Sequence, residues 1–158
     1  MKPIALNLHT LMDRYPGKIR IVFKNFPLNS ECNYTITQTM HSFACEAARV
    51  GLCVEKQGRF KETYEAIFEN QQKLAPGVSL ELAKQMDSDM PLLLRCMVNE
   101  ETSLKIAQDV SEGVQLGVEA TPTLFFNGHK VKGAIPLSLW EKMIDLTLSQ
   151  QSLVKITK

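Results

Sequence analysis

The segment Val118 to Gly128 constrains the fold of this chain more than any other stretch. Thr121-Pro122 predicts a turn, because proline fixes its own φ and favours an extended conformation in the residue before it. The apolar residues Thr123 to Phe126 then predict a short strand. Asn127-Gly128 is typical of a two-residue hairpin turn, so a return strand is expected over Lys130 to Gly133. Together these signals predict a β-hairpin that the chain enters through a proline turn.

The beginning of the chain predicts one helix and one strand. A stripe of apolar residues at helical spacing indicates the helix: Ile4, Leu8, Leu11 and Met12. Ile19 to Phe26 is short and rich in β-branched and aromatic residues, and Pro27 follows it, so we expect a strand there. A polar loop that contains Cys32 comes next.

The middle of the chain, from about residue 38 to residue 116, is expected to be entirely helical. The expected helices are about Met40 to Lys56, about Phe60 to Gln71, a short one capped by Ser79, one that starts at Asp89 and Pro91, and about Glu100 to Leu116. The periodicity of the last helix places one set of residues inward: Leu104, Ala107, Val110 (or Ser111) and Val114. Gly117 fits the C′ position that follows it.

Ser138-Leu139-Trp140-Glu141 is typical of a capping box and predicts a final helix through about Leu148. The expected order is therefore α-β, a block of helices, then β-β-α. With 158 residues, 44% of them apolar and 22% charged, the chain is most simply one domain. A net charge of +1 gives no electrostatic case for binding nucleic acid or an anionic membrane. No signal peptide is visible after Met1, which taken alone suggests the cytoplasm.

The four cysteines are Cys32, Cys45, Cys53 and Cys96. If one helix carries Cys45 and Cys53, they lie about 12 Å apart along its axis, too far for a disulfide. The plausible pairs are then Cys32–Cys45 and Cys53–Cys96, which would fit an oxidising compartment. Buried apolar thiols are the alternative, and a catalytic role is a third.

A zinc site is the remaining interpretation of the cysteines. Cys32, His41, Cys45 and Cys53 could be grouped around a metal, and His41 and Cys45 share a helix face. Structural zinc sites usually have closely spaced cysteine pairs, which this chain lacks, so we expect no metal. His9 and His129 are expected at the surface.

The order of elements resembles the thioredoxin fold with a helical insertion, as in the DsbA-like family of disulfide oxidoreductases. The resemblance covers nearly the whole chain and rests on these segments: Tyr15-Pro16-Gly17-Lys18-Ile19-Arg20-Ile21-Val22, Lys24-Asn25-Phe26-Pro27-Leu28, Phe43-Ala44-Cys45-Glu46-Ala47-Ala48, Gln57-Gly58-Arg59-Phe60 and Gly117-Val118-Glu119-Ala120-Thr121-Pro122-Thr123. It implies an α/β, thioredoxin-like fold with an all-helical insertion. The placement of Cys32 and Cys45 looks like the branch that is sometimes fused to a membrane vitamin K epoxide reductase-like domain.

The chain departs from that family in one decisive respect, because it contains no C-x-x-C. In the family the first strand and the C-x-x-C directly precede the first helix, which here begins near Met1, with Lys2 close to its start. We therefore expect an N-terminally truncated chain without catalytic residues, or else a natural variant that lacks the pair. The full-length form is expected to be periplasmic or extracytoplasmic.

The resemblance also implies a binding role for Thr121 and Pro122. In relatives the proline is cis, and the backbone before it pairs with an incoming peptide; a plain turn before the hairpin is the simpler interpretation. The expected function is thiol–disulfide exchange on extended or unfolded proteins, without a cofactor and with a membrane redox partner in the full-length protein. The alternative is a redox-inactive peptide-binding module.

The resemblance implies that the first strand lies inside the sheet, between the two strands expected at Ile19 to Phe26 and Thr123 to Phe126, so its absence would leave each of them without a partner on one side. We therefore expect Ile19 to Phe26 to pair directly with Thr123 to Phe126, or a neighbouring chain to fill the gap in a homodimer.

Overall fold

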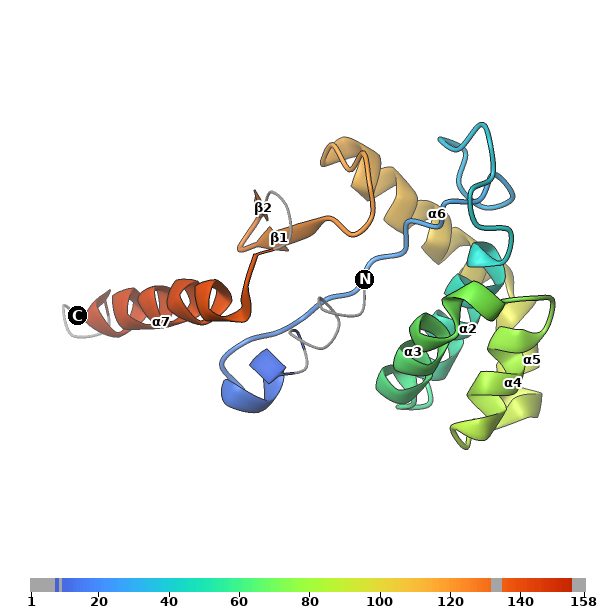
Figure 1. Cartoon of the computed structure of the whole chain (residues 1–158), viewed down its shortest axis with the longest axis horizontal. Helices are drawn as coiled ribbons and strands as arrows, with labels where there is room; N and C mark the ends of the chain where they lie inside the picture. Colours follow the sequence, from blue (N-terminus) through green and yellow to red (C-terminus); the bar gives the residue numbers. More distant parts are fainter. Residues whose placement is uncertain (1–7, 9, 132–134, 155–158) are drawn as a thin grey trace. The chain divides into compact units, whose positions relative to one another are not determined.

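The computed structural model describes residues 8, 10–131 and 135–154 of the chain. The chain divides into two compact units (Figure 1). Met1–Val22 and Pro122–Lys158 belong to the first, called here the terminal unit, and Phe23–Thr121 forms the second, the helical unit. The prediction of a single domain stays a prediction. Met1, Lys2, Ile4, His9 and Gly133 lie outside the described residues.

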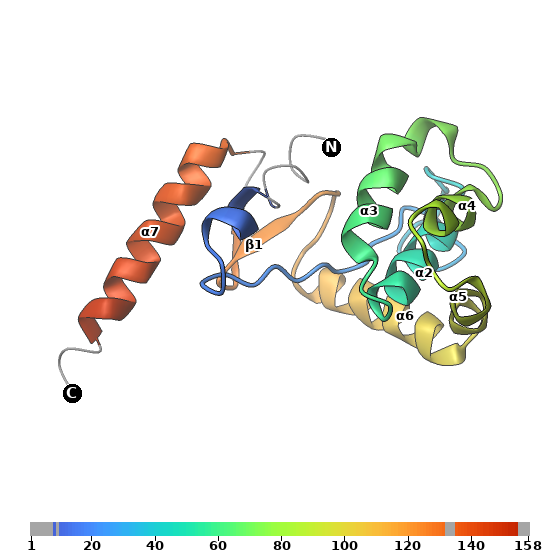
Figure 2. The same ribbon diagram turned by 90° about the horizontal axis from the view of Figure 1, so that it is seen from below.

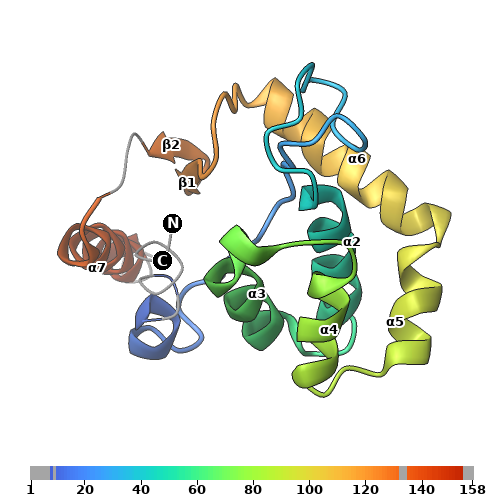
Figure 3. The same cartoon turned by 45° about the vertical axis from the view of Figure 1, so that its right-hand side comes forward.

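The helical unit is built around its first helix. Its helices are α2 (Ala44–Glu55), α3 (Phe60–Glu69), the 3₁₀ turn η1 (Gln71–Lys73), α4 (Val78–Gln85), α5 (Met90–Met97) and α6 (Glu100–Gln115). Helix α2 packs against α3, α4, α5 and α6 (Figure 3). The central side chains of this core are fully buried: Val50, Val54, Ala83 and Leu93. The predicted helical insertion is therefore present.

Two predicted helix ends are confirmed. Asp89 caps α5, because its carboxylate accepts a hydrogen bond from the backbone N–H of Leu92 at 2.9 Å. Gly117 follows α6 with a φ of +69°, a region that glycine enters without steric cost. Its N–H donates to the carbonyl of Val114 at 3.0 Å, and the N–H of Val118 donates to the carbonyl of Gly113 at 2.8 Å. These two bonds form a Schellman motif.

Two predicted caps are wrong. Ser79 lies inside α4 and is buried, and the N–H of Gly77 at the start of that helix donates instead to Glu46 Oε2 at 3.0 Å. The N-cap residue of α4 is therefore Gly77 and not Ser79, and no side-chain hydrogen bond caps this helix. Ser138 likewise lies inside α7 (Leu137–Val154), which begins before the expected capping box and extends beyond Leu148.

The inward face of α6 differs from the prediction. Leu104 is 54% exposed and Val114 is 42% exposed, and Ala107 is exposed as well. Of the predicted set Val110 alone is buried, and the buried side chains are Thr102, Ile106, Asp109 and Val110. Two of these residues are polar, so a pattern based on apolar residues selects the wrong face.

Residues 19–26 form no strand, contrary to the prediction. The sheet of the described residues has two strands, β1 (Leu124–Phe126) and β2 (His129–Val131). Side chains hold part of this segment instead: the Phe23 ring lies 4.9 Å from the Phe60 ring, and the N–H of Asn25 donates to Asp109. Among the described residues β1 pairs with β2, so the expected direct pairing of residues 19–26 with β1 is wrong.

The terminal unit contains the predicted hairpin (Figure 2). Leu124 pairs with Val131 in the antiparallel register. Asn127 and Gly128 have φ values of 47° and 83°, as a type I′ turn requires. The core of this unit joins Leu11 to Trp140 and Ile144 of α7, with hairpin side chains packed against them.

Substitution of two helical glycines by alanine should affect the stability of the protein differently. A Cβ at Gly51 would lie 3.8 Å from the nearest Phe60 carbon, whereas a Cβ at Gly113 would lie 2.8 Å from Phe26 Cδ2. Alanine gains about 1 kcal/mol of helix propensity, and overpacking costs about 1–3 kcal/mol. Gly51→Ala should therefore stabilise the protein, and Gly113→Ala should not. Urea unfolding measures both, and an equal gain at the two sites would contradict the packing of Phe26 on α6.

Candidate functional site

Thr121 and Pro122 precede β1, as predicted, with Thr123 between Pro122 and the first strand residue, Leu124. Thr121 is half-buried and ends the helical unit, whereas Pro122 is exposed and begins the second segment of the terminal unit. Their role in peptide binding and the cis isomer of Pro122 stay predictions.

Both predicted disulfides are present. Cys32 is bonded to Cys45 and Cys53 to Cys96, with Cα–Cα distances of 5.9 and 5.8 Å. All four cysteines of the chain are therefore paired, and the interpretation as buried free thiols is wrong. The zinc interpretation fails for the same reason, because sulfurs in disulfides cannot act as thiolate ligands.

The loop that carries Cys32 is ordered by two buried asparagines that the sequence analysis missed. Asn33 Nδ2 donates to the carbonyl of Pro27 at 2.9 Å, and its Oδ1 accepts from the Thr35 hydroxyl at 2.6 Å. Asn29 Oδ1 accepts from the N–H of Glu31 at 2.8 Å, and its Nδ2 donates to a backbone carbonyl at 2.8 Å. Asparagine favours such local bonds in turns, which is the signal that could have located them.

Each disulfide joins one accessible residue to one buried residue. Cys45 and Cys53 are each 1% exposed, whereas Cys32 and Cys96 are half-buried. A groove of about 310 Å³ lies at Cys32, with Glu31, Tyr34 and Arg49 in its wall. A second groove, of about 280 Å³, lies over Cys53 and Cys96, with Lys56 and Arg95 in its wall. Each bridge therefore borders a groove, the first through Cys32 and the second through both of its cysteines.

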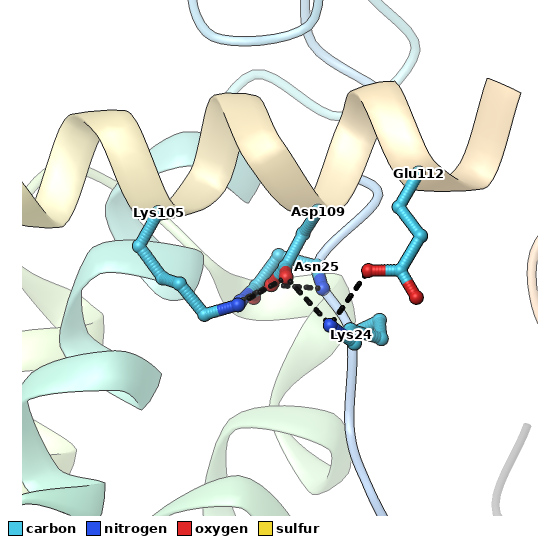
Figure 4. A network of polar contacts seen from close by, with 5 residues as sticks. All are labelled: Lys24, Asn25, Lys105, Asp109 and Glu112. Carbon is cyan, nitrogen blue, oxygen red and sulfur yellow. Dashed lines mark hydrogen bonds and ion pairs between the residues drawn. The ribbon is translucent and has the colours of Figure 1, made fainter. Parts of the chain in front are cut away.

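A polar network centred on Asp109 ties residues 24 and 25 to α6 (Figure 4). The Asp109 side chain is 1% exposed and accepts bonds from Lys105 Nζ at 2.7 Å and from the N–H and Nδ2 of Asn25, each at 3.1 Å. Lys24 Nζ lies 3.4 Å from the same carboxylate and donates to Glu112 at 2.8 Å. Burial opposes ionisation of Asp109, but the bonds from Lys105 and Asn25 prevail and lower its pKa.

The lowered pKa of Asp109 predicts a loss of stability in acid. A carboxyl group with a depressed pKa in the folded state stabilises the protein above its unfolded pKa, ordinarily 3.8, and this contribution is lost as the pH falls through the folded pKa. Asp109→Asn should lower the free energy of unfolding by about 1–3 kcal/mol at pH near 7, and the deficit should shrink in acid. Urea unfolding of both proteins from neutral pH into acid tests this prediction, with Glu55→Gln, an exposed carboxylate outside the network, as the control. A deficit independent of pH would contradict the network.

A family model described as thioredoxin matches residues 4–146, most of the chain. The chain belongs to this thioredoxin family. Membership agrees with the observed architecture, a small hairpin sheet and flanking helices with an all-helical insertion, and it indicates a function in redox or disulfide chemistry. The two disulfides are consistent with that class of function.

This thioredoxin-family chain is also similar to a membrane transporter. It is 28% identical over 116 residues to the Na(+)/H(+) antiporter NhaA 1 of Salinispora arenicola (strain CNS-205). The match covers 73% of this chain but 16% of the antiporter, so the chain corresponds to a small part of that protein. No solved structure matches significantly. Among the described residues, no helix has the length and apolar character needed to cross a bilayer.

Proposed function

We propose that this chain is the helical and peptide-holding part of a DsbA-like thiol–disulfide oxidoreductase, and that these 158 residues alone do not catalyse dithiol exchange. One observation carries this proposal. The chain belongs to the thioredoxin family, yet all four of its cysteines are in disulfides and none of them forms a C-x-x-C. Exchange requires a thiolate, which this chain does not supply in its disulfide-bonded form. The reactive pair would come from a first strand and helix start outside these residues.

Thr121 and Pro122 are the proposed peptide-binding residues. A cis peptide bond at Pro122 would turn the backbone of Thr121 outward, where it could pair with an extended or unfolded substrate chain by β-augmentation. The exposure of Pro122 and its position shortly before β1 support this role.

The proposed location is extracytoplasmic, periplasmic in a bacterium with two membranes. Two disulfides in a small chain favour an oxidising compartment. The similarity to part of an antiporter supports a position beside a membrane. A membrane redox partner is proposed from the family resemblance alone. A homodimer in which a second copy covers the sheet edge is proposed for the 158-residue form.

Insulin reduction tests the enzymatic proposal. The 158-residue protein should show no rate above that of the reductant alone, whereas a form extended by its native upstream residues should accelerate reduction. Serine substitutions in the upstream C-x-x-C should abolish the acceleration, and Cys32→Ala/Cys45→Ala in the same form should retain it. Activity of the 158-residue protein, or an inactive extended form, would contradict the proposal.

The alternative function is a redox-inactive peptide-binding module, which is favoured by the absence of a free thiol among the four cysteines. This interpretation predicts binding of a reduced, unfolded protein by the 158-residue chain, measurable by fluorescence anisotropy. Pro122→Ala should weaken that binding, whereas Pro76→Ala, at a turn in the helical unit, should not. Binding together with an inactive extended form would support the module over the enzyme.

A further inference from the structure

The groove over Cys53–Cys96 combines an accessible sulfur with positive charge. Both cysteines line the groove, but Cys96 is half-buried whereas Cys53 is 1% exposed, so Cys96 is the more accessible half of the bridge. Lys56 and Arg95 lie in the same wall, with the polar side chains of Gln57 and Asn99. Among the described residues that line this groove, none is acidic. Lys56 does pair with Glu101 at 3.4 Å, but both side chains are largely exposed, so solvent screens this contact.

The groove at Cys32–Cys45 differs in charge although its bridge has the same arrangement. It also borders a half-buried cysteine bonded to a buried one. Its one lining cation, Arg49, lies 3.5 Å from the carboxylate of Glu31, which lines the same groove. The lining charges of this groove therefore balance, whereas the groove at Cys96 keeps the positive charge of Arg95 even when Lys56 is counted together with its partner Glu101. The two bridges differ in electrostatics within one small protein.

We propose that the groove over Cys53–Cys96 is a site for small thiols that carry a carboxylate, and that such thiols form a mixed disulfide with Cys96. The thiolate of the incoming molecule attacks Cys96 Sγ and forms a new S–S bond as the Cys53–Cys96 bond breaks. The electron pair of the broken bond passes to Cys53 Sγ, which leaves as a thiolate and takes a proton from water. The carboxylate of the bound thiol pairs with Lys56 or Arg95. This site does not depend on the proposed function.

Thr102 is placed to assist the departure of Cys53. Its hydroxyl oxygen lies 3.9 Å from Cys53 Sγ and 3.6 Å from Cys96 Sγ, and it donates to the carbonyl of Cys96 at 2.7 Å. Rotation of this hydroxyl would let it donate to the new thiolate, which is otherwise buried in an apolar core. The leaving sulfur therefore has a hydrogen-bond donor where burial alone would disfavour its charge.

Three small thiols of different charge test the proposal on the intact chain: mercaptopropionate, mercaptoethanol and cysteamine. The measured quantity is the initial rate of mixed-disulfide formation at Cys96 divided by that at Cys32, by acid quenching and peptide mass spectrometry. The ratio within one molecule cancels the intrinsic reactivity of each thiol. It should be highest for the anionic thiol, intermediate for the neutral one and lowest for the cationic one. The differences in this ratio among the three thiols should become smaller at high salt, because exposed charges are screened.

Charge variants then assign the effect to the groove. Lys56→Gln and Arg95→Gln should each lower the ratio for mercaptopropionate by about two- to fivefold and leave the ratio for mercaptoethanol unchanged. Lys61→Gln, an exposed lysine on α3, is the matched control and should change neither ratio. Three results would each overturn the proposal. They are equal ratios for the three thiols, ratios that do not change on substitution of Lys56 and Arg95, and a mixed disulfide at Cys53.

Discussion

Removal of the Cys53–Cys96 disulfide should lower the free energy of unfolding by about 4 kcal/mol. The bridge spans a sequence separation of 43 residues and joins α2 to α5 through the core of the helical unit. Its main effect in the chain-entropy model is to restrict the unfolded chain, and that effect grows with the length of the closed loop. Cys53→Ala/Cys96→Ala, measured by urea unfolding without reductant, gives the loss directly.

The second bridge is the internal control for this prediction. Cys32–Cys45 spans a separation of 13 residues, for which the same model predicts about 3 kcal/mol. Cys32→Ala/Cys45→Ala should therefore be the milder double variant, and its effect should be centred on the loop that Asn29 and Asn33 order. A larger loss from the shorter loop would contradict the entropic account of these bridges.

Ile106→Ala should be strongly destabilising and Leu104→Ala nearly neutral. Ile106 is 1% exposed against the core of the helical unit, whereas Leu104 is 54% exposed on the same helix. Truncation of a fully buried aliphatic side chain costs about 2–5 kcal/mol, because it loses apolar burial and leaves a cavity. Truncation at the surface usually changes stability by about 0.5 kcal/mol or less.

This pair of variants also decides which face of α6 is inward. The apolar periodicity of the sequence places Leu104 inside, and the structure places Ile106 and Asp109 there. Urea unfolding of the two single variants distinguishes the two interpretations of α6. Val110→Ala is the reference, because both interpretations bury Val110. A larger loss at Leu104 than at Ile106 would contradict the packing of α6 in this structure.

Features that depend only on residues close together along the chain were predictable from the sequence. The Asn127-Gly128 turn needs only the φ values that its two residues favour, and both are positive as expected. Gly117 and Asp89 were assigned correctly for the same reason, since each completes hydrogen bonds within its own helix end. The separation of Cys45 and Cys53 along a single helix excluded one of the three possible pairings of the four cysteines, and the pairing judged plausible is the one that is present.

Features that depend on distant partners were not predictable. Residues 19–26 have the composition of a strand, but a strand forms only where another edge is available. Ser79 and Ser138 match capping patterns, yet Gly77 is the N-cap residue of α4 and α7 begins already at Leu137. The sequence analysis did not single out Asp109, because its partners Lys24 and Asn25 lie far away along the chain.

The candidate site was predictable in part for the same reasons. The sequence identified the cysteines, Thr121 and Pro122, and the missing C-x-x-C, because each is a property of residue type and order. It did not reveal which sulfur of each bridge is accessible or the difference in charge between the two grooves. Those properties arise only when the loop at Cys32, α2, α5 and α6 come together.

The central claim is that the four cysteines of this chain bridge the helical unit and that none of them is a free nucleophile. Peptide mapping without reductant, after treatment of the native protein with iodoacetamide, tests it most directly. The account predicts two cross-linked pairs, Cys32 with Cys45 and Cys53 with Cys96, and no alkylated cysteine. An alkylated cysteine in the native protein, or any other pairing, would contradict it.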